Sequence, residues 1–178
     1  RSWKEILFGV TLLLAFSASG VLAESGVSDK EILVGGSLDL TGPAAFMGQG
    51  VHRGIKLYFS KVNAGGGIHG RKLTFVAEDD GYVVAKTVAN YKKLTMKDNV
   101  FAMLGSSGSV GPKALIPYLA EDKVPMLGPY GYTSAMFRPP VRYLFNIYST
   151  CEDQARILMD FVKANLKMDK PKIGLLAE

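Results

Sequence analysis

The feature that most constrains the fold is a regular alternation of short apolar runs and longer amphipathic segments. Runs rich in β-branched and small residues predict strands, and apolar residues at helical spacing between them predict helices. The predicted strands are EILVGGSLDL (near 32–38), RKLTFVAED, NVFAMLG, VPMLGP and RYLFNIY, and the predicted helices are 47–62, 84–94, 112–122 and 152–166. Almost continuously apolar strands that alternate with helices favour an α/β fold with a doubly wound parallel sheet, covered on both faces.

The N-terminal segment has the pattern of a secretory signal peptide. Arg1 and Lys4 form a basic start, residues 6–16 are apolar, and small residues lead up to Ala23. This pattern predicts export and cleavage after Ala23, because a membrane-spanning helix would need about 20 apolar residues. The first residue is not Met, and the last run, KIGLLAE, begins a strand without completing it. We therefore expect the sequence to be part of a longer protein.

Charge and the few metal-binding residue types argue against several classes of protein. The formal net charge is +5, and the positive residues are scattered rather than gathered in a basic stripe, so nucleic acid is not an expected partner. Cys151 is the single cysteine, for which we expect a buried, inert thiol. His52 and His69 share no metal-ligand spacing with it, and neither a metal nor a cofactor is expected.

Four segments follow predicted strands, where ligands bind in open parallel sheets. They are DLTGPAAFMG, EDDGY, GSSGSVG and GPYGYTS. Glycine serves tight turns, but three glycine-rich loops on one edge favour a surface that a ligand can approach closely. The run GGGIHG (65–70) has the glycine spacing of a dinucleotide-binding motif. Such a motif follows a strand and precedes a helix, whereas this run follows a predicted helix and precedes a predicted strand. GSSGSVGPK lacks the Gly-Lys-Ser/Thr ending of a phosphate-binding loop.

The serines of the third loop do not form a catalytic motif. Around Ser109 the first glycine of a G-x-S-x-G elbow is replaced by Ser107, and neither histidine is placed to act as a base. Asp80 is expected to cap the following helix rather than to work as an acid or base. The sequence therefore predicts a binding protein and not an enzyme.

Ser107, Gly108 and Ser109 lie where a predicted strand ends and a helix begins. Free backbone N–H groups at a helix N-terminus carry partial positive charge, and hydroxyls beside them can donate to a carboxylate. We therefore predict that this loop binds an anion. An alternative is that Ser109 caps its own helix, which would still leave amides facing outward.

Together, the motifs resemble the leucine/isoleucine/valine-binding type of periplasmic solute-binding protein. The likeness rests on GGSLDLTGPAAFMGQGVHRGIKLYFSKVNAGGGIHGRKLTFVAEDD, GSSGSVGPKALIPYL and VPMLGPYGYTSAMFRPPVRYLFNIY. It implies the type I periplasmic binding fold, in which two similar lobes close on a ligand and deliver it to the membrane permease of an ABC importer. The implied domains are a signal peptide at 1–23, a ligand-binding lobe at 24–148, and at 149–178 a crossover with the start of a second lobe. The implied full-length protein is periplasmic and monomeric and needs no cofactor.

The resemblance also implies which residues contact the ligand. Ser107 takes the place of the serine that binds the ligand carboxylate. The other implied contacts are Met47, Ser106, Gly108, Ser109, Tyr130, Gly131, Tyr132 and Thr133. Leucine-binding relatives have small residues and a threonine where this chain has Tyr130 and Tyr132, which argues against a branched-chain amino acid as the ligand. The expected ligand is a small carboxylate-bearing compound, either amino acid-like or an aromatic acid. Tyr82 and Ser106 take the places of a disulfide found in some relatives.

Two other functions stay open. The same module could be the extracellular ligand-sensing domain of a receptor or regulator, which sequence downstream of Glu178 would distinguish. An α/β hydrolase is less favoured, since it would need a histidine base from outside this sequence.

Overall fold

A five-stranded parallel sheet forms the centre of the computed structural model, which describes residues 24–166, 172 and 174. The strands, in chain order, are β1 (Glu31–Leu38), β2 (Lys72–Asp79), β3 (Ala102–Ser106), β4 (Met126–Leu127) and β5 (Leu144–Phe145). Their order across the sheet is β2-β1-β3-β4-β5, and every neighbouring pair is parallel. The predicted doubly wound α/β sheet is confirmed.

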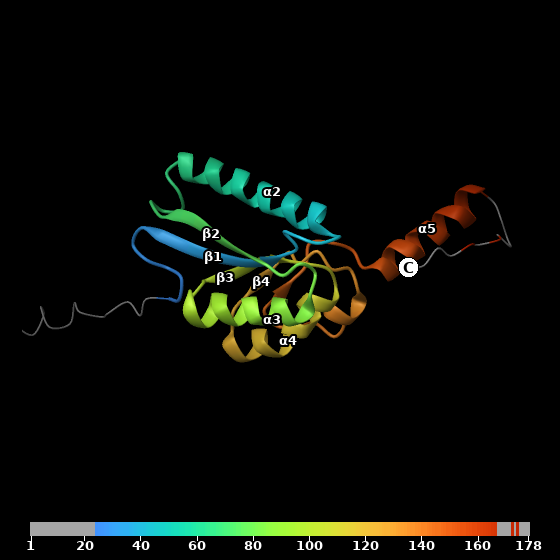
Figure 1. Ribbon diagram of the computed structural model, residues 1–178. Helices are drawn as coiled ribbons and strands as arrows, with labels where there is room; N and C mark the ends of the chain where they lie inside the picture. The colour runs from blue at the N-terminus through green and yellow to red at the C-terminus, as the bar shows by residue number, and fades with distance from the viewer. Residues whose placement is uncertain (1–23, 167–171, 173, 175–178) are drawn as a thin grey trace, which may run out of the picture.

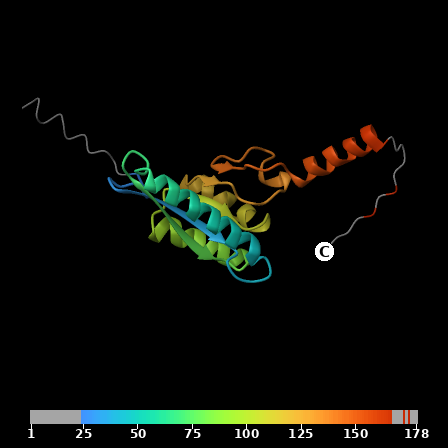
Figure 2. The same ribbon diagram turned by 90° about the horizontal axis from the view of Figure 1, so that it is seen from above.

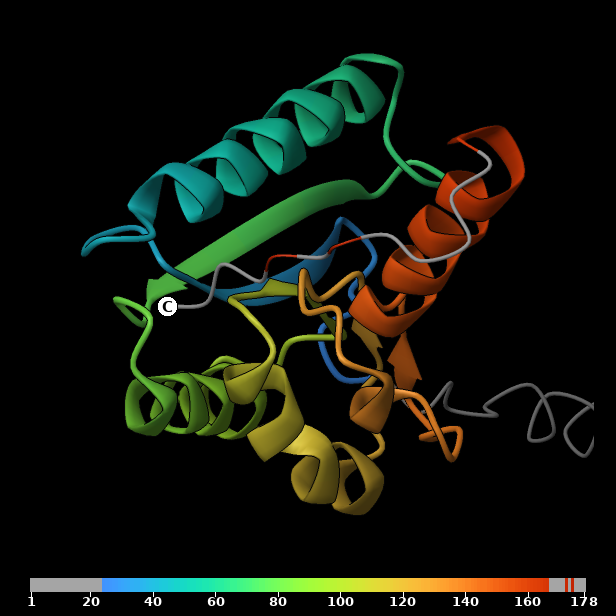
Figure 3. The same ribbon diagram turned by 90° about the vertical axis from the view of Figure 1, so that its right-hand side faces the viewer.

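Helices cover both faces of the sheet (Figures 1 and 3). They are α2 (Ala45–Ala64), α3 (Val84–Lys92), which continues as the π-helical turn η1 (Lys93–Lys97), α4 (Val110–Asp122), the 3-10 turn η2 (Ser134–Met136) and α5 (Cys151–Leu166). The helix α2 lies on one face, and α3 and α4 lie side by side on the other. The chain leaves β1 toward β2 and then returns to β3 on the other side of β1, so the winding direction reverses between β1 and β3.

The core lies between the sheet and the pair α3 and α4. Its buried members are Tyr91, Leu94, Val100, Met103, Leu115, Leu119, Met126, Met136 and Leu144. On the opposite face, Phe75 of β2 packs against Phe59 of α2, with ring centroids 6.2 Å apart. A Cβ on Gly36 would lie 2.6 Å from the Phe75 ring, so this strand position needs glycine.

The last two strands are much shorter than predicted. Only two residues of VPMLGP and two of RYLFNIY pair in the sheet. Pro125 cannot donate a ladder hydrogen bond, and Gly128 and Tyr143 have positive φ angles of 57° and 70°, which interrupt extended backbone. By contrast, Pro117 lies inside α4 without ending it at that point.

The helix α5 projects away from the rest of the lobe (Figures 1 and 2) and buries none of its residues. Cys151 at its first position is exposed, so the expectation of a buried thiol is wrong. Thr150 caps the helix by accepting from the Asp153 N–H at 3.1 Å. Within residues 24–166, no helix is long and apolar enough to span a membrane. The predicted signal peptide, and KIGLLAE apart from Lys172 and Gly174, lie outside the described residues.

Candidate ligand-binding site

A buried network of three side chains joins the ends of β1, β3 and β4 at the point where the winding direction reverses. The Ser107 hydroxyl donates to Asp39 Oδ1 at 2.8 Å and accepts from the Asp39 backbone N–H at 2.6 Å. The Tyr130 hydroxyl also donates to Asp39 Oδ1 and lies 2.8 Å from Ser107 Oγ. Open α/β sheets bind ligands at this position, beyond the carboxyl ends of the strands.

These three residues form the floor beneath the loops. Asp39 is fully buried, and Ser107 and Tyr130 are 4% and 5% exposed. Burial, together with the bond to Asp39, raises the pKa of Tyr130 far above its ordinary value, so the phenol remains a hydrogen-bond donor. Asp39 Oδ2 and the Ser106 hydroxyl are also buried and have no hydrogen-bond partner in the described part of the chain. Sequence reasoning missed Asp39, although a carboxylate directly after a buried strand was a usable signal.

Above this floor, the loop that leads into α4 leaves its amides free. Ser109 occupies the N-cap position but makes no capping bond; its hydroxyl instead accepts from the Tyr132 N–H at 3.2 Å. The alternative that Ser109 caps its own helix is therefore wrong. The backbone N–H groups of Gly108 and Ser109 donate to no acceptor within residues 24–166. They lie at the positive end of the α4 dipole, where backbone N–H groups have no acceptor within the helix.

In the two neighbouring loops, by contrast, carboxylates accept from several of the backbone amides. Asp79 accepts from the backbone N–H groups of Leu40, Thr41 and Gly81 at 2.9, 3.1 and 3.0 Å. Asp80 accepts from the Tyr82 N–H at 2.9 Å. The prediction that Asp80 caps the helix is wrong, because the N-cap of α3 is Val83 and has no side-chain cap. In the loop before α4, no carboxylate of residues 24–166 accepts from the Gly108 or Ser109 N–H.

Aromatic and aliphatic side chains surround these amides. A Cβ on Gly108 would lie 2.6 Å from the Tyr82 hydroxyl, so the Tyr82 phenol lies against this loop. Tyr132 packs edge-on against Tyr148, with ring centroids 5.2 Å apart. Tyr82, Tyr148 and Val110 are about half exposed or more. The surface next to the free amides therefore suits a ligand with an apolar body.

The structure brings most of the predicted site residues together. Gly131 touches the loop before α4, where a Cβ on it would lie 2.4 Å from the Gly108 carbonyl oxygen. Ser106, Ser107, Gly108, Ser109, Tyr130 and Tyr132 belong to the same cluster through the contacts described above. Met47 and Thr133 are half-buried, and no hydrogen bond between described residues joins their side chains to it.

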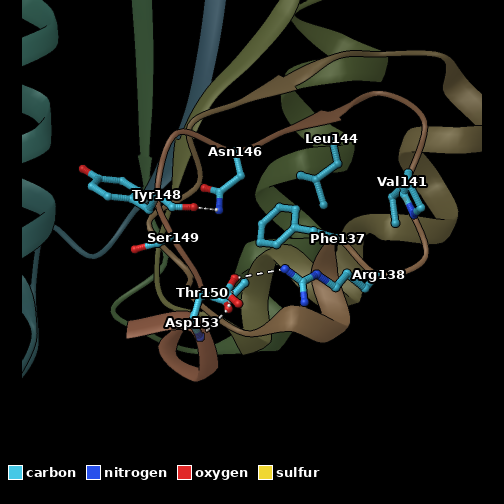
Figure 4. Close-up of a pocket in the computed structure, with 10 residues that line it drawn as sticks. Phe137, Arg138, Val141, Leu144, Asn146, Tyr148, Ser149, Thr150 and Asp153 are labelled. Carbon is cyan, nitrogen blue, oxygen red and sulfur yellow. Dashed lines mark hydrogen bonds and ion pairs between the residues drawn. The ribbon is translucent and has the colours of Figure 1, made fainter. Parts of the chain in front are cut away.

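A cavity of about 380 Å³ lies beside the start of α5 (Figure 4) and includes none of the predicted site residues. Phe137, Val141 and Leu144 line its apolar side. On its polar side Arg138 pairs with Asp153 at 3.1 Å. Two further hydrogen bonds join the start of α5 to the loop after β4. The Cys151 N–H donates to the Tyr132 carbonyl, and the Ser134 hydroxyl donates to Glu152.

Acid should loosen the first two loops through Asp79. The hydrogen bond from the Thr41 hydroxyl, with the three backbone amides, lowers the pKa of Asp79 below its ordinary value. A carboxylate whose pKa is lowered on folding stabilises the folded state at pH values above its ordinary pKa. This stabilisation is lost as the pH falls through the lowered pKa. We expect full-length wild type to have a larger free energy of unfolding than Asp79→Asn at pH 7, and the gap to close below about pH 4.

Urea unfolding between pH 2.5 and pH 7 would measure this gap. Asp29→Asn, at an exposed carboxylate, is the matched control and should leave the pH dependence unchanged. A gap between wild type and Asp79→Asn that stays constant over the whole range would contradict the role of Asp79.

The parallel sheet with strand order β2-β1-β3-β4-β5 and helices on both faces matches a lobe of the type I periplasmic binding fold. The sequence profile described as "Periplasmic binding protein" matches residues 31–177. The chain therefore belongs to the periplasmic binding protein family, and the resemblance noted from its motifs is confirmed.

Individual relatives agree with this assignment. A Leu/Ile/Val-binding protein homolog of Brucella abortus is 31% identical over 83% of this chain and 38% of its own length. A fatty acid ABC transporter substrate-binding protein from Thermomonospora curvata matches with a TM-score of 0.71 and 31% identity, over 80% of this chain and 36% of that one. A substrate-binding periplasmic protein from Ralstonia solanacearum matches with a TM-score of 0.69 and 31% identity, over 76% of this chain and 38% of that one. The chain thus spans less than half the length of these relatives, which are binding proteins and not enzymes, as expected.

Proposed function

We propose that the full-length protein captures a small carboxylate-bearing solute, amino acid-like or aromatic, in the periplasm and passes it to the membrane permease of an ABC importer. The observation that carries this proposal is the loop before α4, whose Gly108 and Ser109 amides have no acceptor within the described chain. The relatives described above are all binding proteins, which supports it. Residues 1–23 direct export and are then cleaved off after Ala23.

In this proposal the ligand carboxylate accepts hydrogen bonds from the Gly108 and Ser109 amides. The Ser109 hydroxyl accepts from Tyr132, so its own proton is free to donate to the ligand. Ser107 holds the loop in place from below, because its hydroxyl is already bonded to Asp39. Met47, Tyr82, Tyr132 and Tyr148 lie around the ligand body, while Tyr130 supports the floor. Residues 149–178 begin a second lobe that closes over the ligand, and the protein works as a monomer.

An aliphatic acid is the second candidate ligand. The relative from Thermomonospora curvata is a fatty acid transporter substrate-binding protein, and the exposed Val110 beside the free amides is aliphatic. Both candidates share the carboxylate and differ only in the ligand body.

A thermal-shift screen of the full-length protein without residues 1–23 would test the proposal. The panel pairs each acid with its neutral amide: amino acids, benzoic acids and fatty acids. The matching acid should raise the free energy of unfolding by about 2.7 kcal/mol at a hundred times its Kd, and its amide should do so far less. Equal shifts from an acid and its amide, or no shift from any acid, would contradict a carboxylate site.

A further inference from the structure

The outer side of α2 contains two glycines that the lobe itself does not need. A Cβ added to Gly50 or Gly54 would meet nothing within 4 Å. At Gly48, on the inner side of the same helix, a Cβ would lie 2.4 Å from the Asp39 carbonyl oxygen. Glycine inside a helix destabilises it relative to alanine. Gly48 is explained by packing against Asp39, whereas Gly50 and Gly54 require an explanation outside the lobe.

Large apolar side chains flank these two glycines. At 100° per residue, Phe46, Gly50 and Leu57 lie on the line of α2 opposite to the buried Gly48. Phe46, Leu57 and Tyr58 are 73%, 75% and 63% exposed. Phe46 and Leu57 lie on this line on either side of Gly50, and Tyr58 lies next to Gly54, so the apolar surface is indented where the glycines have no side chain. Small residues in such a dent let a second helix approach the backbone closely.

The charge on α2 is of one sign only. The helix contains no Asp or Glu, and Arg53, Lys56 and Lys61 are all exposed. A second copy of the same surface would bring like charges together, which is unfavourable. An anionic membrane would attract the positive side chains of α2, but a membrane surface would not require glycine at positions 50 and 54. A helix with acidic side chains accounts for both observations.

We propose that the outer face of α2, defined by Phe46, Gly50, Arg53, Gly54, Leu57 and Lys61, docks a helix of another protein. That helix carries a stripe of small and apolar residues, flanked by Asp or Glu. The stripe packs into the dent at the two glycines, and the acidic side chains pair with Arg53 and Lys61. This docking does not rest on the proposed ligand site, which lies beyond the carboxyl ends of the strands.

The experiment uses the full-length protein and a stapled, fluorescein-labelled helical peptide of about 20 residues. The peptide has Leu and Ala at i, i+3, i+4 and i+7 spacing and Glu on both sides of this stripe. Fluorescence anisotropy should show saturable binding. Filling the dent with Gly50→Leu and Gly54→Leu should raise the Kd about 30-fold or more, while the melting temperature stays the same or rises.

Matched variants separate this surface from general stickiness and charge. Leu57→Ala and Lys61→Glu should each raise the Kd about tenfold. Met96→Ala and Lys97→Glu, at exposed positions of η1, should change it less than about twofold. The same peptide with Lys in place of Glu should not bind.

Three peptide results would overturn the proposal: the acidic peptide does not bind saturably, the lysine peptide binds equally well, or binding persists when Gly50 and Gly54 are replaced by Leu. A different occupant of this face would overturn it too. The protein would then co-float with vesicles of phosphatidylglycerol, or dimerise in sedimentation velocity, and Leu57→Ala would abolish that association.

Discussion

Ser109→Asp should make the full-length protein more stable and at the same time unable to hold a carboxylate ligand. The new carboxylate at the N-cap can accept from the Gly111 N–H and complement the helix dipole, which together stabilise a helix by about 1 kcal/mol. A ligand carboxylate at the neighbouring Gly108 and Ser109 amides would meet a like charge. Two unit charges 4 Å apart repel by about 4 kcal/mol at an effective dielectric constant of 20. We therefore expect a loss of at least about 100-fold in ligand affinity, measured by titration calorimetry with the acid found in the screen.

Ser109→Asn is the matched control for charge. Its side-chain oxygen can cap the helix about as well as Asp, so it should stabilise the protein similarly. It brings no like charge, and its effect on ligand affinity should be much smaller. If Ser109→Asp binds the acid as tightly as wild type does, the ligand carboxylate does not lie at these amides.

The parts of the fold that sequence predicted well are those that local pattern determines. β1, β2 and the helices α2 and α4 lie within a few residues of their predicted bounds, because apolar periodicity is set by the elements themselves. β4 and β5 came out shorter than predicted. Their length depends on which backbone groups can pair, and Pro125 and the positive φ angles of Gly128 and Tyr143 limit that pairing.

The meeting of the loops after β1, β3 and β4 at one edge could also be predicted, since parallel strands bring all their carboxyl ends to one side. The inner structure of the site could not. The bond between Asp39 and Ser107 joins residues 68 positions apart and depends on how β1 and β3 pack. Serine is a common helix-capping residue, but the Ser109 hydroxyl instead accepts from the backbone N–H of Tyr132 in another loop. Cys151 is exposed because it begins a helix that no other element within residues 24–166 covers.

Asp39→Ala should have the second large effect, on the free energy of unfolding. Asp39 Oδ1 accepts from the hydroxyls of both Ser107 and Tyr130, and hydrogen bonds to charged groups contribute about 1.5–3 kcal/mol each. The alanine variant of the full-length protein should therefore lose about 3–5 kcal/mol, since both buried hydroxyls also lose their acceptor. The amides above this floor should shift as well, which lowers ligand affinity. Urea unfolding and calorimetry would measure the two losses.

A double-mutant cycle with Tyr130→Phe identifies the cause of the loss. Tyr130→Phe alone should cost about 1.5–3 kcal/mol, and clearly less when Asp39 is already alanine, because the bond to Asp39 is gone and only the contact with Ser107 is left to lose. Asp39→Asn keeps an oxygen that can accept from both hydroxyls, removes a buried charge, and should stay within about 1 kcal/mol of wild type. Additive effects of Asp39→Ala and Tyr130→Phe would show that the two residues do not act together. In that case the loops after β1 and β4 would be held by packing alone, and Asp39 would not position the site.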